Sequence, residues 1–397
     1  MREAAAPPDE PAFSLVLGGP FFRLLRWAHL SDDALRRVRR RMAVVVVAAW
    51  LPLLLLSAVE GHLLGPGPAL TFLRDPEAQV RFLLVVPMLI GAELWVHQRL
   101  RPLVEQFRIR GLVPPGGVER FDRALAGALR LRQSVLAEAL IVVFVYVVGV
   151  LIVWRQYVAL DAPSWYASPG AGGERLSIAG VWYVFFSIPL FQFLLYRWYF
   201  RLFIWARFLW QVSRIHFDLL ATHPDKTGGL GFIGASIWAF VPLAAAQGAL
   251  LAASIANRIL YDGDTLRQFD VVIGVLVLIL LCVFVGPLLV FAPQLARVKR
   301  QGLREYGSLA QGYVRDFNTK WMRGGAPADE PFLGSGDIQS LADLGNSFSV
   351  VEGMRLAPLP RAALLTFVAA TLAPITPLLL TIMPLEKLVQ SLVGIVL

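Results

Sequence analysis

Two carboxylates lie inside apolar segments that are long enough to cross a membrane. Glu93 lies about four residues before the end of the segment 81–96, and Glu138 about four residues after the start of 134–154. At a rise of about 1.5 Å per residue both are about 6 Å below the interface, so their depths match in antiparallel helices. Intramembrane acids coordinate cations, relay protons or form ion pairs. The nearest candidates for such pairs are Arg99, Arg132 and Arg197.

A second candidate site is the stretch HPDKTGGLGFIG at residues 223–234. Pro224 ends the preceding helix, and Asp225 or Thr227 can cap the next one. The resulting helix N-terminus, with Lys226 beside it, predicts a loop that holds an anion or a phosphate. A tight capped turn with a solvated lysine is the alternative. The residues assigned to this loop are His223, Asp225, Lys226, Thr227, Gly228 and Gly229.

The apolar segment 231–256 carries a ridge of small side chains that recur at every fourth residue, a spacing that places them on one helix face. Small residues let membrane helices approach closely. Gln247 lies near the middle of this segment, where a polar side chain needs a partner or water. The ridge indicates a central helix that packs against a neighbour or lines a pathway. The residues predicted to line an ion pathway are Glu93, Glu138, Gln247, Gly248, Ala244 and Ala252.

A basic and aromatic stripe follows the segment 178–199. Arg197, Arg201, Trp205 and Phe208 recur at three- and four-residue spacing. One interpretation is a helix that lies in the headgroup layer. The other is a basic mouth, formed by Arg197 and Arg201, that concentrates anions.

Motifs of soluble enzyme chemistry are missing. The five histidines form no H-x-x-x-H or H-E-x-x-H pair, and no Walker loop or G-x-S-x-G elbow occurs. The single cysteine, Cys282, lies in an apolar run and allows no intrachain disulfide. We therefore predict no metal, no cofactor and no catalytic residue.

The elements that must position these residues are membrane helices. The chain of 397 residues is 57% hydrophobic and 16% charged, with a mean hydropathy of +0.62. Soluble domains average about 45–50% apolar residues. We predict an all-α integral membrane protein with about seven transmembrane helices and additional interfacial and cytoplasmic amphipathic helices. The predicted spans are 42–59, 81–96, 134–154, 178–199, 231–256, 271–291 and 362–383.

The basic residues predict the orientation. Of the 37 lysines and arginines, 30 fall in alternate connections that we assign to the cytoplasm. The interpretation is a multi-pass protein of the bacterial inner membrane with a cytoplasmic N-terminus and a periplasmic C-terminus. Because topology explains the net charge of +9, nucleic-acid binding has no support.

Four regions are predicted along the chain. An N-terminal cytoplasmic or interfacial segment (1–41) precedes a six-helix membrane region (42–291), whose cytoplasmic loops are 97–133 and 197–231. A cytoplasmic helical hairpin (292–361) follows. The seventh transmembrane helix and a periplasmic amphipathic tail complete the chain (362–397).

Two stretches carry a resemblance. HPD-x-x-GGLGF at 223–232 and GSGDIQSLADLGNSF at 334–348 resemble segments of a group of bacterial multi-pass membrane proteins. The resemblance covers the second half of the chain and implies a membrane architecture. It brings no activity, cofactor or catalytic residue.

Three function classes remain open. The first is a channel or transporter for an ion or small solute, working as a homo-oligomer in the lipid bilayer. The second is a membrane-embedded enzyme that acts on a lipid or polyprenyl phosphate, with His223 or Asp225 as the acid or base. The third is a sensor or scaffold that works through the helices of 295–351.

Overall fold

Helices build almost all of this protein, as predicted. A computed structural model describes residues 13–28, 37–64, 70–153, 164–170 and 173–381. Within those ranges the one sheet is a short antiparallel hairpin of β1 (Ala167–Gly170) and β2 (Gly173–Leu176), in which Ala167 lies opposite Leu176. The all-α membrane class is therefore confirmed. The predicted tail, which follows the span 362–383, and the first residues, 1–12, lie outside the described residues.

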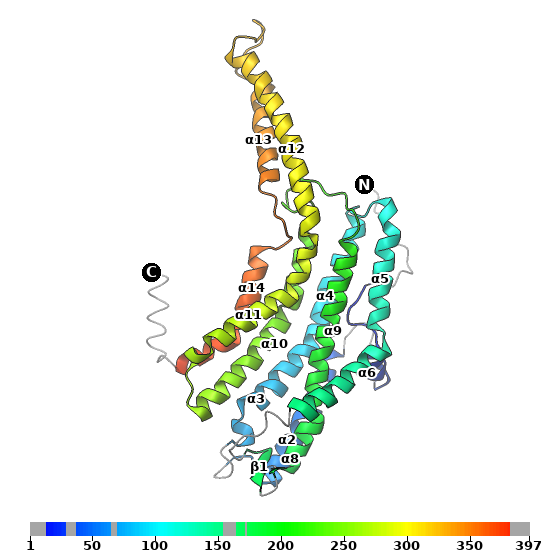
Figure 1. Ribbon diagram of the computed structural model, residues 1–397, viewed down its shortest axis with the longest axis vertical. Helices are drawn as coiled ribbons and strands as arrows, with labels where there is room; N and C mark the ends of the chain where they lie inside the picture. Colours follow the sequence, from blue (N-terminus) through cyan, green and yellow to red (C-terminus); the bar gives the residue numbers. More distant parts are fainter. Residues whose placement is uncertain (1–12, 29–36, 65–69, 154–163, 171–172, 382–397) are drawn as a thin grey trace.

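Six described helices are long and apolar enough to cross a membrane (Figure 1). The first is α2 (Val38–Val59). Each of the other five joins an α-helix to shorter α, π or 3-10 segments. The second consists of α3 (Pro76–Gln79), η2 (Val80–Val85) and α4 (Val86–Ile109), and the next of α8 (Ile178–Trp182), η5 (Tyr183–Ser187) and α9 (Ile188–Val212). The last three are η6 (Gly231–Ala235) with α10 (Ser236–Asn257) and η7 (Arg258–Asp262), η8 (Leu266–Phe269) with α11 (Asp270–Phe284), and α14 (Arg361–Leu372) with η11 (Ala373–Thr381). The last span changes from α to 3-10 winding at Ala373, next to Pro374 and Pro377, because proline cannot donate a backbone hydrogen bond.

The third predicted span takes a different form. The helix made of η3 (Pro115–Gly117) and α5 (Val118–Arg132) ends at Arg132. The next helix, α6 (Val135–Phe144) with η4 (Val145–Val153), is bent from it by 47°. Ser134 starts α6 by accepting a hydrogen bond from the backbone N–H of Ala137 at 3.2 Å, which is an N-cap that separates the two helices. Counted with this bent pair, the described spans reach seven.

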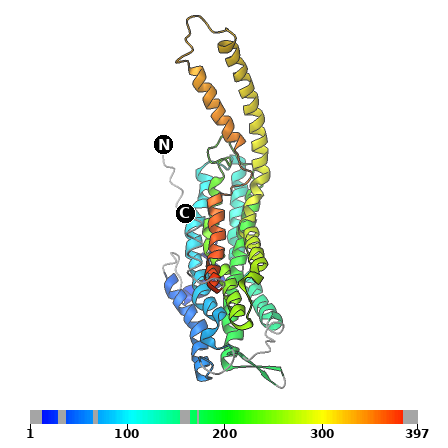
Figure 2. The ribbon, with the colours of Figure 1, turned by 90° about the vertical axis from the view of Figure 1, so that its left-hand side faces the viewer.

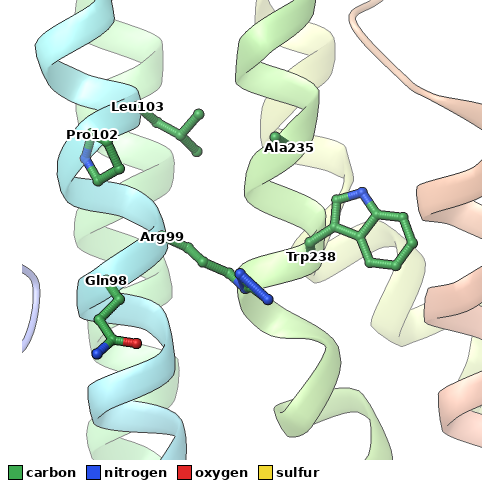
Figure 3. A pocket seen from close by; sticks show the side chains of 6 residues that line it. All are labelled: Gln98, Arg99, Pro102, Leu103, Ala235 and Trp238. Atoms are coloured by element: carbon green, nitrogen blue, oxygen red, sulfur yellow. The ribbon is translucent and has the colours of Figure 1, made fainter.

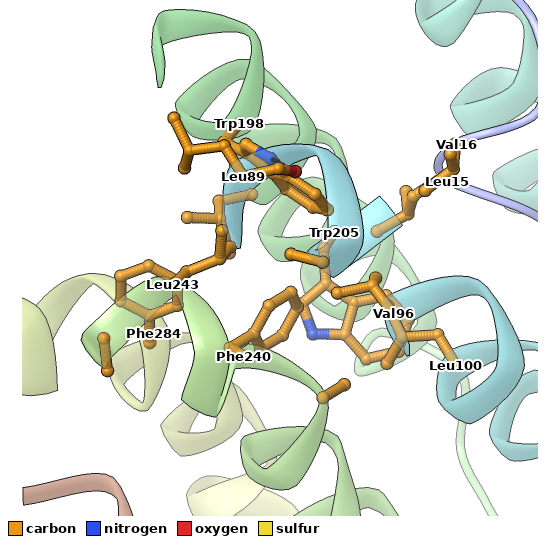
Figure 4. Packing of buried hydrophobic residues seen from close by; sticks show 14 of the residues in the cluster. Leu15, Val16, Leu89, Val96, Leu100, Trp198, Trp205, Phe240, Leu243 and Phe284 are labelled. Carbon is orange, nitrogen blue, oxygen red and sulfur yellow. Dashed lines mark hydrogen bonds between the residues drawn. The ribbon is translucent and has the colours of Figure 1, made fainter. Parts of the chain in front are cut away.

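The centre of the bundle is α10, which packs against α4 on one side and α14 on the other. Figure 4 shows Trp198, Trp205, Phe240 and Leu243 filling the space where α4, α9 and α10 meet. The indole N–H of Trp198 donates to the carbonyl of Leu89 at 2.9 Å and ties α9 to α4. The spans therefore share one aromatic core.

A two-helix arm extends from one end of the bundle (Figures 1 and 2). It begins after η9 (Gly286–Phe291) and consists of α12 (Ala292–Phe317), η10 (Asn318–Met322) and α13 (Gly336–Glu352), with α12 and α13 packed together. Lys320 donates to Glu330 at 2.6 Å and to Asp337 at 2.8 Å. These contacts hold the turn of the arm closed. A short helix, α1 (Pro20–Trp27), and a 3-10 turn, η1 (Phe72–Arg74), complete the described elements.

Candidate functional site

Five charged side chains meet inside the helical bundle. They come from four different helices: α2 supplies one arginine, α4 and α6 one glutamate each, and α9 two arginines one helical turn apart. All five are between 3% and 8% exposed. We call them the arginine–glutamate cluster, and its members are Arg41, Glu93, Glu138, Arg197 and Arg201.

Glu93 is the centre of this cluster. Its Oε1 lies 2.8 Å from the guanidinium Nη1 of Arg201 and 3.5 Å from that of Arg197. Its Oε2 pairs with Arg41. One carboxylate of α4 is thus held by arginines of two neighbouring helices, an arrangement that links α2, α4 and α9.

Glu138 connects the cluster to the N-terminal segment. Arg197 donates from Nε to Oε1 of Glu138 at 3.1 Å. The other oxygen, Oε2, accepts from the backbone N–H of Phe21 at 2.7 Å, in the first turn of α1. A carboxylate at a helix N-terminus stabilises the unpaired N–H groups there. Glu138 therefore joins α1, α6 and α9.

The charges of the cluster do not balance. Three guanidinium groups face two carboxylates, so with all five ionised the cluster carries one excess positive charge. The Nε of Arg41 is buried and makes no hydrogen bond. The indole Nε1 of Trp205, one turn beyond Arg201, is also buried without a hydrogen-bond partner. Both unsatisfied atoms are donors. A buried group of this kind has the electrostatics to attract an anion.

The sequence pointed to part of this cluster. Arg197 contacts both glutamates, as one of the predicted pairings required. Arg99 instead stacks on the ring of Trp95, with 3.7 Å from its Cζ to the ring centroid, and Arg132 donates to the carbonyl of Ser14 at 2.6 Å. Arg41 was missed, because an arginine ahead of an apolar run looks like a membrane-edge residue.

Arg197 and Arg201 do not form an exposed basic mouth. Each is 4% exposed, and Trp205 and Phe208 beyond them are 2% and 0% exposed. Since α9 belongs to one candidate span that runs without a break from Ile178 to Val212, these buried residues lie within the bundle. Both interpretations of the basic stripe are therefore corrected. Its arginines face inward because Glu93 and Glu138 are their partners.

The ridge of α10 is a packing seam. A Cβ atom placed on Gly248 would lie 1.9 Å from the backbone oxygen of Thr371 in α14. Ala244 and Ala252 are 0% and 7% exposed and belong to apolar clusters. Gln247 donates from Nε2 to the hydroxyl of Tyr199 at 2.9 Å. The space in front of the ridge is thus filled by α14.

The loop 223–231 binds its own carboxylate. Asp225 accepts backbone hydrogen bonds from Thr227 at 2.7 Å, Gly229 at 3.2 Å and Gly231 at 2.9 Å. Burial alone would raise the pKa of Asp225, but these three donors, together with nearby His223, bring it below its ordinary value. The donors that would hold an external anion are therefore occupied. Thr227 is buried, and Lys226 is exposed with a φ of 55°.

The loop also fastens the arm to the bundle. The backbone N–H of Arg355, just after α13, donates to the carbonyl of Lys226 at 2.7 Å. The guanidinium of Arg355 donates to the carbonyl of Asp225 at 3.0 Å. A Cβ on Gly228, whose φ is 65°, would lie 3.3 Å from Met354. The stretch singled out in the sequence is thus a structural junction between α10 and the arm.

A second polar group lies near β1, at the end of the bundle opposite to the arm (Figure 1). Buried Asp75 caps α3 and accepts from the indole of Trp165 at 3.0 Å and from the amide of Asn257 at 3.3 Å. Arg81 donates to the hydroxyl of Tyr183 at 2.5 Å and to Glu77 at 3.1 Å. We call these residues the Asp75 cluster. We did not predict this cluster from the sequence.

No family model, curated protein or solved structure matches this chain. Among the described residues, no group of three or more histidines, cysteines, aspartates or glutamates could hold a metal ion. Each polar cluster contains a buried arginine Nε without a hydrogen bond, Arg41 in one and Arg81 in the other. The arginine–glutamate cluster is the one in which positive charges outnumber negative ones.

Proposed function

We propose that this protein is a membrane transporter or channel for a small anion, with the arginine–glutamate cluster on the pathway of the anion. The proposal includes the bacterial inner membrane and a homo-oligomer, both of which are expectations from the sequence. The observation that carries it is the excess of one guanidinium in a buried group. Charged residues within membrane spans are rare and usually belong to a pathway or a relay.

Anion binding follows from the donors that the cluster leaves free. Arg41 and Trp205 each have a buried N–H without a partner, and an unsatisfied buried donor costs about 1–3 kcal/mol. A bound anion would relieve that cost and neutralise the excess charge. A cation would find no free carboxylate in the cluster, because both carboxylates already pair with arginines.

The pathway does not run along the ridge of α10, because α14 fills that space. We place it instead between α2, α4 and α9, where π-helical turns interrupt two of the three spans, at η2 and η5. Such turns occur often at functional sites. Pro52 interrupts the third span, in α2, and proline removes a helix hydrogen bond there.

The scaffold function is the second candidate, because the arm exposes large apolar side chains. Leu309, Val314 and Leu333 are 57%, 41% and 85% exposed on α12 and the turn of the arm, and such side chains are typical of contact surfaces. The enzyme function has less support. Its phosphate-holding donors in the loop 223–231 are satisfied by Asp225.

Anion flux into liposomes tests the proposal. The purified chain is reconstituted, and uptake of chloride, nitrate, phosphate and acetate is measured against empty liposomes. We expect flux of at least one anion and none of sodium or potassium. Arg201→Lys retains the charge but cannot contact Glu93 with the geometry of a guanidinium, so it should change the flux or the order of anion preference.

Arg101→Lys is the matched control, because Arg101 is half exposed and pairs with Glu105 on the same helix as Glu93. It should leave flux unchanged, and both variants should elute like the wild type in size exclusion. Absence of flux for every anion, or equal effects of the two variants, would contradict the proposal.

A further inference from the structure

A cavity of about 420 Å³ lies between α4 and α10, away from the arginine–glutamate cluster. It is lined by Gln98, Arg99, Pro102, Leu103, Ala235 and Trp238 (Figure 3). In that view the side chain of Arg99 leaves α4 and reaches across toward α10. The cavity therefore offers one positive charge among mostly apolar side chains.

Arg99 is held in place but not neutralised. Its guanidinium stacks on Trp95 at 3.7 Å, and the indole N–H of Trp95 donates to the carbonyl of Trp238 at 3.0 Å. The Nε of Arg99 is buried and makes no hydrogen bond. None of the carboxylates in the described part of the chain forms an ion pair with Arg99. Its donors are thus available to a ligand.

The position of the cavity matches a headgroup layer. The apolar part of the second span ends at Val96, and polar residues Gln98, Arg99 and Arg101 follow. Trp95 and Trp238 are 40% and 37% exposed, and tryptophan rings gather at the boundary between membrane and water. A cavity at such a boundary is within reach of lipid headgroups.

We propose that this cavity binds the phosphate of a phospholipid headgroup, with Arg99 as its main contact. Guanidinium groups present two parallel N–H donors that suit a phosphate, and basic pockets between membrane helices bind anionic lipid headgroups. Pro102 and Leu103, one turn beyond Arg99, give the cavity an apolar wall on the side away from the membrane, so the glycerol end of the lipid lies toward Trp95. The bound lipid would bridge α4 and α10.

Lipid binding by the full-length protein in detergent tests this proposal. The probes are dioctanoyl phosphatidylglycerol, dioctanoylglycerol, which lacks the phosphate, and inorganic phosphate, each titrated and followed by native mass spectrometry. We expect phosphatidylglycerol to bind tightest. Arg99→Gln should weaken that binding about tenfold, because a charge-assisted hydrogen bond is lost, and should leave dioctanoylglycerol unaffected.

Arg101→Gln is the matched control, because Arg101 lies on the same helix and already pairs with Glu105. It should change binding less than twofold. Arg99→Lys keeps the charge without the two parallel donors and should lie between wild type and Arg99→Gln. If Arg99→Gln does not fold, Arg99→Lys replaces it as the test variant.

Three results would overturn the proposal. The first is equal binding by wild type and Arg99→Gln, or, where only the lysine variant folds, by wild type and Arg99→Lys. The second is equal losses in the Arg99 and Arg101 variants. The third is occupancy by inorganic phosphate without phosphatidylglycerol, which would make free phosphate the ligand.

Discussion

At the scale of single residues, arginine has a role here that lysine could not take. The guanidinium of Arg197 spans two carboxylates, with Nε on Glu138 and Nη1 on Glu93, because its donors point in fixed and different directions. The ammonium of a lysine is a single point charge and would not reach both. The arginine–glutamate cluster thus depends on the shape of its side chains as well as on their charge.

The first prediction concerns Glu93. Glu93→Gln leaves three arginines with one carboxylate, and breaking a buried ion pair in this way costs about 3–5 kcal/mol. We expect a lower thermal midpoint, measured by tryptophan fluorescence in detergent. The double variant Glu93→Gln with Arg41→Gln restores the original net charge and should recover part of the loss.

Glu105→Gln is its control, because Glu105 forms an exposed pair with Arg101 on the same helix. It should change stability by less than about 1 kcal/mol. Equal midpoints for Glu93→Gln and Glu105→Gln would show that the buried cluster does not stabilise the fold.

The second prediction concerns Asp225, whose three backbone hydrogen bonds hold its pKa below the ordinary value of 3.8. The stabilisation is therefore present above that value and is lost as the pH falls through the lower pKa of the folded state. Asp225→Asn keeps only one acceptor oxygen and should lose about 1–3 kcal/mol at neutral pH. Hydrogen exchange of 223–235 and 353–357 should rise together.

Asp218→Asn removes an exposed carboxylate next to the same loop and should leave that exchange unchanged. If Asp225→Asn accelerates exchange in 223–235 alone, the loop does not fasten the arm to the bundle.

At the scale of elements, α10 and α14 approach each other closely where α10 has no side chain. The Cβ that Gly248 lacks would overlap the carbonyl of Thr371, so the α10–α14 distance depends on glycine at this position. The same helix face carries Ala244, which is fully buried. Small residues in this seam bring α14 into the bundle.

The third prediction compares two glycines in membrane helices. Gly248→Ala should destabilise the protein by about 1–3 kcal/mol because it forces α10 and α14 apart, and Gly248→Leu should prevent folding or assembly. Gly274→Ala in α11 meets nothing within 4 Å. It should stabilise by less than about 1 kcal/mol, since alanine favours a helix.

Thermal midpoints and size-exclusion profiles of the three variants check this. Should Gly248→Leu elute and melt like the wild type, α10 and α14 would not be in the contact described here.

At the scale of the whole molecule, two polar clusters lie on the same long helical span. Arg81 and Glu93 are separated by about 18 Å at a rise of about 1.5 Å per residue. Between them the core is apolar and aromatic, with Leu89, Phe191 and Trp198 buried. The bundle is therefore held by polar contacts toward each end and by packing in the middle.

The fourth prediction tests the orientation of the molecule. With exposed Cys282 replaced by serine, single cysteines are introduced by Ala328→Cys in the turn of the arm and Asp262→Cys between α10 and α11, at opposite ends (Figure 1). An impermeant maleimide should label position 262 in intact bacteria. Position 328 should react only after permeabilisation, because the basic loops predict a cytoplasmic arm.

Both positions are exposed, so each should react in detergent, which serves as the control. Labelling of position 328 in intact cells would reverse the predicted orientation.

The sequence by itself determined the class of this protein and most of its spans. Apolar runs of spanning length decide helix formation locally, because every backbone group in a bilayer must find its partner within the helix or barrel. Six of the seven predicted segments coincide with described spans. The third, predicted over 134–154, begins at Ser134 as expected, but it counts as a span only together with α5, from which it is bent by 47°.

The sequence predicted Arg197 as a partner of the two glutamates, but only the tertiary structure brought Arg41 and Arg201 to Glu93. Arg41, Glu93, Glu138 and Arg201 come from four helices, and no spacing along one chain segment encodes contacts between different helices. A buried arginine and a surface arginine look the same in sequence; only the carboxylate that another helix brings within reach distinguishes them, because an unpaired buried charge costs several kcal/mol. The basic stripe of α9 therefore faces inward, toward Glu93 and Glu138.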